Sequence, residues 1–173
     1  MTTELPDPRH PGAYAVAFVC TGNICRSPSA DVVLRAKLVE AGLEDRVRVA
    51  SCGIAGWHVG DPMDSRSAAH LRGRGYNPDE HRAQQVTPAW LRDFDVLFAM
   101  DRGHVDGLRQ LGEGPVRLFR EFDPDDAGAD TPDPYYGGDD GFAEVLSMVE
   151  RTCDHLVPAI ERALDRSQDP AGR

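Results

Sequence analysis

AYAVAFVCTGNICRSPSA, residues 13–30, places an apolar run directly before a polar loop and a serine-proline pair. The run Ala13–Val19 is apolar throughout, which is typical of a strand buried on both faces. Ser27 is a favoured helix N-cap residue and Pro28 suits the first helical position, so we expect a helix that ends at Gly42. The stretch therefore predicts a strand, a loop and a helix in succession.

The same alternation continues along the chain. Further strands are expected at residues 47–51, 95–100 and 115–119, and further helices at residues 65–72, at residues 102–111 and from Phe142 onward. Residues 120–141 are rich in Asp, Pro and Gly and predict a long loop. The pattern predicts an α/β fold: a single doubly wound domain with a four-stranded parallel sheet flanked by helices on both faces. We expect this domain over residues 14–165, with a flexible N-terminal tail at 1–13 and a polar C-terminal tail at 166–173.

Composition and charge restrict the class of protein. The chain has 173 residues, 40% hydrophobic and 28% charged, which fits one globular domain. A formal net charge of -10 disfavours nucleic acid as a partner. The apolar runs are too short to span a bilayer, and the first fourteen residues contain charges and prolines where a secretion signal needs an apolar stretch. We expect a cytoplasmic protein that binds no membrane and is a monomer or a weak dimer.

The cysteines and histidines point away from structural cross-links. Four cysteines are too few and too scattered for a disulfide scaffold, so free thiols are expected at Cys20, Cys25, Cys52 and Cys153. No pair has the C-x-x-C spacing of a zinc site, and the six histidines form no helical metal-binding pair. We therefore expect neither a metal nor another cofactor.

The loop from Cys20 to Arg26 has the features of an anion site. A turn between a strand and a helix N-terminus presents unpaired backbone N–H groups at the positive end of the helix dipole. The Arg26 guanidinium adds a planar fork that suits phosphate. Because these groups all favour the thiolate over the thiol, Cys20 is predicted to be a nucleophile that attacks a bound phosphoryl group.

The nine residues Cys20-Thr21-Gly22-Asn23-Ile24-Cys25-Arg26-Ser27-Pro28 resemble the signature of low-molecular-weight protein tyrosine phosphatases. Segments around Trp57, His81, Asp101 and Asp133 also resemble family segments, in the family's order. The resemblance covers about residues 14–164. It implies hydrolysis of phosphotyrosine and of aryl phosphates through a phosphocysteine intermediate.

The resemblance also implies individual roles. Asp133, in Asp133-Pro134-Tyr135-Tyr136, is implied to be the general acid and base, whereas the residues alone rank it equal with Asp130 in a crowded acidic loop. Cys25 is implied to form a protective disulfide with the nucleophile. Phosphate binding is assigned to the loop as a whole, and the list is Thr21, Gly22, Asn23, Ile24, Cys25, Arg26 and Ser27.

Other residues are expected to support the loop or to form the substrate cleft. Ser27 is implied to donate to the departing Cys20 sulfur besides capping the helix, while Asn23, Ser51 and His81 resemble the network that holds the loop. Asp101, after a buried strand, is expected to be supporting rather than catalytic. Cleft walls are expected from Trp57, Tyr135, Tyr136 and Thr21, and packing of the three aromatic side chains in the core is the less favoured alternative. Thr21 occupies a position where the family varies, so we expect it either to widen the pocket mouth or to alter substrate preference.

Two other functions fit parts of the sequence. An arsenate reductase shares a similar fold, but it needs relay cysteines that residues 100–114 do not contain. A non-enzymatic sensor of phosphate or redox state could use the Cys20 and Cys25 pair, but it would have no use for an acid at Asp133. The expected partners are thus phosphotyrosine-containing proteins, with phosphate or another oxyanion in the loop.

Overall fold

The computed structural model describes residues 4–168 of the chain. Within these residues the strands β1 (Tyr14–Cys20), β2 (Val47–Gly53), β3 (Val96–Ala99) and β4 (Val116–Leu118) form one parallel sheet in the order β2-β1-β3-β4. The helices are α1 (Arg26–Glu40), α2 (Ser65–Gly73), α3 (Pro88–Asp93), α4 (Arg102–Leu111) and α5 (Asp139–Gln168), with a short 3-10 helix η1 at Phe119–Phe122. The prediction of a doubly wound α/β fold is confirmed.

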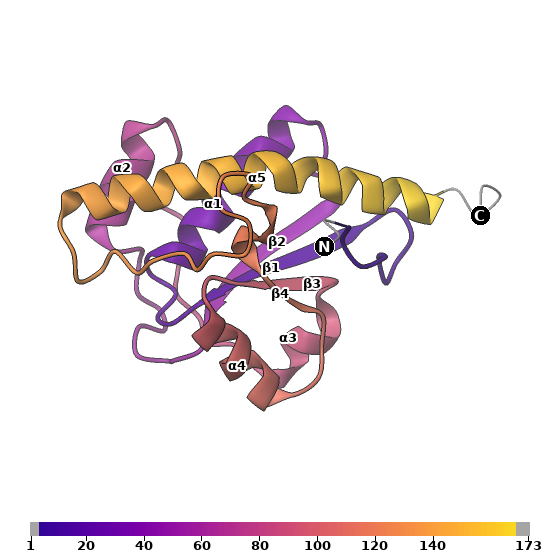
Figure 1. Ribbon diagram of the computed structural model, residues 1–173, viewed down its shortest axis with the longest axis horizontal. Helices are drawn as coiled ribbons and strands as arrows, with labels where there is room; N and C mark the ends of the chain where they lie inside the picture. The colour runs from indigo at the N-terminus through magenta and orange to yellow at the C-terminus, as the bar shows by residue number, and fades with distance from the viewer. Residues whose placement is uncertain (1–3, 169–173) are drawn as a thin grey trace.

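The sheet separates two hydrophobic cores. Helices α1, α2 and α5 cover one face and α3 and α4 cover the other (Figure 1). Val16 and Phe18 belong to the core on the α1 and α5 side, whereas Ala17 and Val19 belong to the core on the α3 and α4 side. All four side chains have no exposed surface. Each large apolar side chain buried in this way contributes about 2 kcal/mol, which explains why β1 is apolar at every position.

The central position of β1 determines where ligands can bind. Strand β1 pairs with β2 on one side and β3 on the other. The helix that follows β2 packs on the α1 and α5 side of the sheet, whereas the helix that follows β3 packs on the opposite side (Figure 1). In doubly wound folds ligands bind at such a switch point, beyond the carboxyl ends of the strands. The loop that follows Cys20 lies at this point.

Several element boundaries differ from those expected. Helix α3 was not expected, because six residues span less than two turns and show no helical periodicity. Strand β2 continues to Gly53, and α5 begins at Asp139, inside the segment predicted to be a loop. The long helix nevertheless contains Pro158 without ending there.

The prediction of a flexible tail over residues 1–13 is wrong for residues 4–13, which pack against the domain. Leu5 is buried in the larger core, and the Tyr14 hydroxyl donates to the Pro6 carbonyl at 2.8 Å. The Arg9 backbone N–H donates to Asp95 at 2.7 Å. Proline-rich segments have no periodicity, so a single apolar anchor is invisible to pattern analysis. Residues 166–168 of the predicted C-terminal tail are helical, and residues 1–3 and 169–173 lie outside the described residues.

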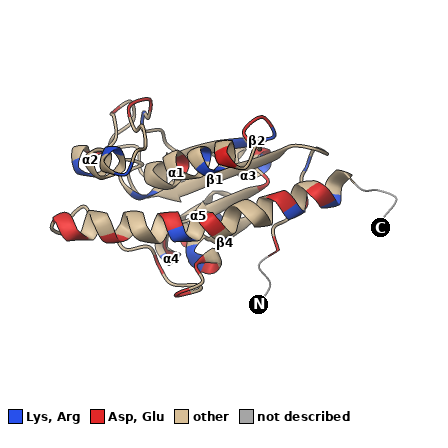
Figure 2. Ribbon diagram, turned by 90° about the horizontal axis from the view of Figure 1, so that it is seen from above, with Lys and Arg blue, Asp and Glu red and all other residues tan. Residues whose placement is uncertain are grey.

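Helix α5 carries only acidic charges up to Glu150, and acidic and basic residues are mixed from Arg151 onward (Figure 2). One of their contacts to other elements is the ion pair of Lys37 with Asp154 at 2.6 Å. Surface pairs of this kind contribute at most about 1 kcal/mol each. Among residues 4–168, no helix combines the length and the apolar character needed to cross a membrane.

Candidate active site

The loop of residues 20–26 connects the carboxyl end of β1 to the first turn of α1. It rests on the chain that follows β2, where the Ala55 backbone N–H donates to the Thr21 carbonyl at 2.9 Å. A Cβ on Gly53 would lie 2.7 Å from the Thr21 carbonyl oxygen and 3.1 Å from the Asn23 nitrogen. Only glycine fits at this close approach of two backbones, so Gly53 allows the loop to pack directly against the end of β2.

Asn23 holds the loop in a conformation that few residues adopt. Its φ of 60° lies in the left-handed region, and its side chain is fully buried. The amide donates to Ser27 Oγ at 2.8 Å and to Ser51 Oγ at 3.0 Å, and its oxygen accepts from the Gln84 backbone N–H at 3.0 Å. Burial lowers the pKa of His81, so the neutral ring carries a proton on Nε2, which donates to the Asn23 carbonyl at 2.7 Å. The predicted supporting residues Ser51 and His81 therefore meet at Asn23.

Ser27 contacts the cysteine and does not cap the helix. Helix α1 begins at Arg26, its N-cap is Cys25, and no side chain caps it, so the expected capping by Ser27 is wrong. The Ser27 Oγ instead lies 2.9 Å from Cys20 Sγ. Because the Asn23 amide donates to Ser27 Oγ, the serine hydrogen points to one of two acceptors, Cys20 Sγ or the more distant Cys52 carbonyl at 3.4 Å. The helix therefore starts two residues earlier than expected, at Arg26 instead of Pro28.

Arg26 is buried, and its two terminal nitrogens, Nη1 and Nη2, contact different partners. Nη1 donates to Asp101 Oδ2 at 2.8 Å and to the Thr131 carbonyl at 3.0 Å, which fixes the plane of the guanidinium. Nη2 lies 3.5 Å from Asp133 Oδ2 on the pocket side. Burial alone would raise the pKa of Asp101, but hydrogen bonds from the Arg26 side chain and from the His104 backbone N–H outweigh it, so the pKa falls below its ordinary value. Asp101 is therefore a charged partner of Arg26.

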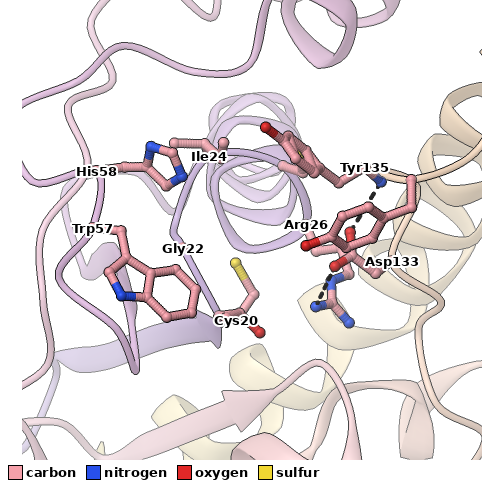
Figure 3. A pocket seen from close by; sticks show the side chains of 11 residues that line it. Cys20, Gly22, Ile24, Arg26, Trp57, His58, Asp133 and Tyr135 are labelled. Carbon is pink, nitrogen blue, oxygen red and sulfur yellow. Dashed lines mark hydrogen bonds and ion pairs between the residues drawn. The ribbon is translucent and has the colours of Figure 1, made fainter.

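Asp133 and Asp130, which the residues alone could not rank, lie in different environments. Asp133 lines the pocket together with Cys20, and its Oδ1 accepts from the Tyr135 backbone N–H at 3.0 Å (Figure 3). Asp130 forms an ion pair with Arg102 at 3.0 Å and does not line this pocket. The geometry thus favours Asp133 as the candidate acid.

Aromatic side chains form the walls of the pocket. Trp57 and His58 lie on one side of Cys20, and Asp133 and Tyr135 lie on the other (Figure 3). Trp57 is 77% exposed and Tyr136 is 89% exposed, which excludes the alternative that they pack in the core. Such exposed rings around a pocket suit a flat aromatic ligand.

All four cysteines are free and buried. Cys25 lines the same pocket as Cys20, and burial raises the pKa of its thiol to about 12. Cys52 and Cys153 have no exposed surface, and burial raises the pKa of both. Within residues 4–168 no group of three or more His, Cys, Asp or Glu side chains is arranged to hold a metal ion.

Two histidines at the site were not identified from the sequence. His58 lines the pocket next to Trp57. His104 bonds to Thr21 Oγ1 at 2.8 Å and forms a capping box with Asp101. His104 stands three residues after Asp101, which is the spacing of a capping box, but nothing in the sequence links it to Thr21.

Known proteins resemble the chain over most of its length. The family model described as low molecular weight phosphotyrosine protein phosphatase matches residues 15–168. A low molecular weight protein-tyrosine-phosphatase of Streptomyces coelicolor is 45% identical over 159 residues, 88% of this chain and 96% of the relative. The low molecular weight protein-tyrosine phosphatase A of Mycobacterium tuberculosis is 44% identical over 167 residues, 94% of this chain and 98% of the relative.

Solved structures share the fold as well. A protein tyrosine phosphatase from Entamoeba histolytica superposes with a TM-score of 0.83 at 30% identity, covering 87% of this chain and 98% of its own. YfkJ from Bacillus subtilis superposes with a TM-score of 0.81 at 35% identity, covering 87% of this chain and 96% of its own. The family predicted from the nine-residue signature is thereby confirmed, and the chain belongs to the low molecular weight phosphotyrosine protein phosphatases.

Proposed function

We propose that the protein hydrolyses phosphotyrosine in proteins, and aryl phosphates generally, through a phosphocysteine formed on Cys20. The observation that carries this proposal is the convergence of three groups in one pocket. Cys20 Sγ faces the opening, Arg26 Nη2 is free of the Asp101 contact, and Asp133 lies 3.5 Å from that nitrogen (Figure 3). A nucleophile, an oxyanion-binding cation and a proton donor are the groups that phosphate transfer to sulfur requires.

In the first step the Cys20 thiolate attacks phosphorus while the bond from phosphorus to the phenolic oxygen breaks. The protonated Asp133 gives its proton to that oxygen, which leaves as the phenol. The conjugate acid of the leaving group has a pKa near 10, so this proton transfer is worth about a hundredfold in rate or more. Arg26 and the loop N–H groups balance the charge on the equatorial oxygens during the transfer.

In the second step water attacks the phosphocysteine and the bond from phosphorus to sulfur breaks. Asp133, now a carboxylate, takes a proton from the water. The Ser27 hydroxyl, 2.9 Å from Cys20 Sγ, donates to the departing thiolate. Inorganic phosphate leaves, and the site returns to its starting charge.

The walls of the pocket support phosphotyrosine as the substrate. Trp57, Tyr135 and Tyr136 are exposed where the ring of a phosphotyrosine would pass on its way to Cys20. A ring buried between aromatic side chains gains on the order of 1 kcal/mol per contact beyond its apolar area. A short phosphoserine side chain would leave these contacts unused.

The alternatives from the sequence have less support. An arsenate reductase needs a relay of thiols, but Cys52 and Cys153 have no exposed surface. A phosphate or redox sensor would not need the acid that Asp133 supplies beside Arg26. The matched family and relatives are phosphatases.

The two thiols of the loop also support redox control of the activity. Cys20 and Cys25 line the same pocket and are both free. Peroxide would oxidise Cys20 to a sulfenic acid, and Cys25 would then displace water from that sulfur to form a disulfide. A dithiol would restore the enzyme. In the Cys25→Ser variant, recovery after peroxide treatment should fall sharply, and unchanged recovery would reject the disulfide.

The central test is replacement of the nucleophile. Cys20→Ser should abolish release of p-nitrophenol from p-nitrophenyl phosphate, while circular dichroism shows the native fold. Rapid quenching of the wild type with a radiolabelled aryl phosphate should trap label on the peptide that contains Cys20. Turnover that survives in Cys20→Ser, or label on another residue, would remove Cys20 from this role.

A further inference from the structure

Thr21 is the residue after the nucleophile, and its hydroxyl has a partner outside the loop. Its Oγ1 lies 2.8 Å from Nε2 of His104, in the first turn of α4. Thr21 also lines the pocket that contains Cys20 and Asp133. A polar side chain at the pocket wall is thus connected to a buried ring on a different element.

The surroundings of His104 determine which nitrogen carries its proton. The Asp101 backbone N–H donates to His104 Nδ1 at 3.2 Å, so Nδ1 is an acceptor and carries no hydrogen. Asp101 Oδ1 also lies 3.2 Å from Nδ1, but it accepts from the His104 backbone N–H at 3.1 Å, as the capping box requires. Burial, with the positive charge of Arg26, lowers the pKa of His104 to about 4, which keeps the ring neutral. The single ring hydrogen is therefore on Nε2.

This tautomer determines the direction of the Thr21 hydroxyl. Nε2–H donates to Thr21 Oγ1, so the threonine cannot donate its own hydrogen to His104. Among residues 4–168 no other side-chain partner of Thr21 Oγ1 is found. Since Thr21 lines the pocket, its hydrogen remains free for a ligand there.

We propose that the Thr21 hydroxyl donates a hydrogen bond to a phosphoryl oxygen of the bound substrate, and that His104 is the positioning residue that directs it. The inference rests on the proposed function, because it adds a donor to the same phosphate site. Thr21 then contributes a side-chain donor beside Arg26 Nη2 and the loop amides. A chain with an aliphatic residue at this position lacks that donor.

The contact predicts a particular kinetic signature. The donor meets an oxygen that carries negative charge in the ground state, in the transition state and in the product phosphate. Its loss should therefore raise KM and the inhibition constant of inorganic phosphate together, with little change in kcat. A hydrogen bond to a charged oxygen supports an effect of about tenfold.

The test compares Thr21→Val, which keeps the side-chain shape, with Thr21→Ser, which keeps the hydroxyl. Inorganic phosphate should inhibit Thr21→Val about tenfold more weakly than the wild type, and Thr21→Ser should recover most of that loss. His155→Gln, at an exposed histidine on α5, serves as the control and should match the wild type. Equal phosphate inhibition of the wild type and Thr21→Val would overturn the proposal.

A second experiment examines His104 without relying on turnover. Nitrogen-15 NMR of the wild-type imidazole at pH 7 should show a protonated Nε2 and an unprotonated Nδ1; the opposite tautomer would overturn the positioning role. His104→Ala should weaken phosphate binding severalfold in the wild-type background and leave it unchanged in the Thr21→Val background. Additive losses would show that His104 acts by another route. If the wild type binds phosphate and shows this tautomer but hydrolyses no aryl phosphate, the proposed function fails separately.

Discussion

Replacing Asn23 tests whether its hydrogen bonds and its left-handed backbone conformation maintain the shape of the loop at residues 20–26. Asn23→Ala removes two amide hydrogen bonds, to Ser27 and Ser51, and leaves the Gln84 backbone N–H without its acceptor. Three lost bonds at about 1 kcal/mol each amount to about 3 kcal/mol. Alanine at a φ of 60° adds about 1 kcal/mol of backbone strain, so the free energy of unfolding should fall by about 4 kcal/mol.

Glycine separates the two contributions. Asn23→Gly loses the same hydrogen bonds but adopts the left-handed region without strain, so it should be about 1 kcal/mol more stable than Asn23→Ala. Asn77→Ala is the matched control, because Asn77 is exposed and makes one local turn contact, to the Asp79 backbone. Its cost should stay below about 1 kcal/mol.

The assay is urea unfolding followed by circular dichroism, with phosphatase activity measured on the same samples. Both Asn23 variants should lose most activity under conditions where they remain folded, because the loop amides no longer converge. A loss below about 1 kcal/mol for Asn23→Ala would refute the reasoning. So would an Asn23→Gly variant less stable than Asn23→Ala.

Other changes give separate expected outcomes. Asp133→Asn should slow phosphotyrosine hydrolysis about a hundredfold and slow an aryl phosphate with an acidic phenol far less, while the neighbouring Asp130→Asn should change neither rate; equal losses on both substrates would reassign the acid. Burial alone would raise the pKa of Asp123, but hydrogen bonds from arginines, Arg151 first among them, hold it well below its ordinary value. The stability that Asp123 contributes should therefore be complete above pH about 3.9 and decrease as pH falls below that value, and Asp123→Asn should cost about 3 kcal/mol at pH 7 in urea unfolding. If the free energy of unfolding of Asp123→Asn decreased below pH about 3.9 as steeply as that of the wild type, this assignment would be contradicted. Trp57→Ala, at a 77% exposed position, should raise KM for a phosphotyrosine peptide while changing stability by less than about 0.5 kcal/mol, and a large loss of stability would show that the ring packs in the native core.

Much of the fold could be predicted because β1 and α1 are encoded locally. The apolar run before Cys20 is buried on both faces, and a parallel strand buried in this way is recognisable as a continuous apolar run in the sequence. The packing of Leu5 and the formation of α3 depend on contacts with distant residues, which leave no periodic signal. The start of α1 was misplaced for a related reason, since the side chain of Ser27 bonds to Cys20 instead of the helix backbone.

Predictions for the site divide in the same way. The contiguous loop carries its chemistry in its own residues, so Cys20 and Arg26 could be proposed from spacing alone. Asp133 and Asp130 are indistinguishable as sequence, and only their different neighbours, Arg26 and Arg102, separate them. The role of His104 could not be predicted, because it depends on a contact with Thr21, which is 83 positions away in the sequence and outside the range of any local pattern.

The clasp between the two ends of the described chain has a practical consequence for protein engineering. The Arg166 guanidinium donates to the Leu5 carbonyl at 2.8 Å and pairs with Glu4 and Asp7, so the beginning and the end of the domain meet at one place. A short peptide could join them, and new termini could be opened at the exposed turn around Gly42, far along the chain from Cys20. Such a circular permutant should retain its catalytic loop intact, whereas a fusion partner attached directly at Glu4 or Gln168 would compete with the contacts of Arg166.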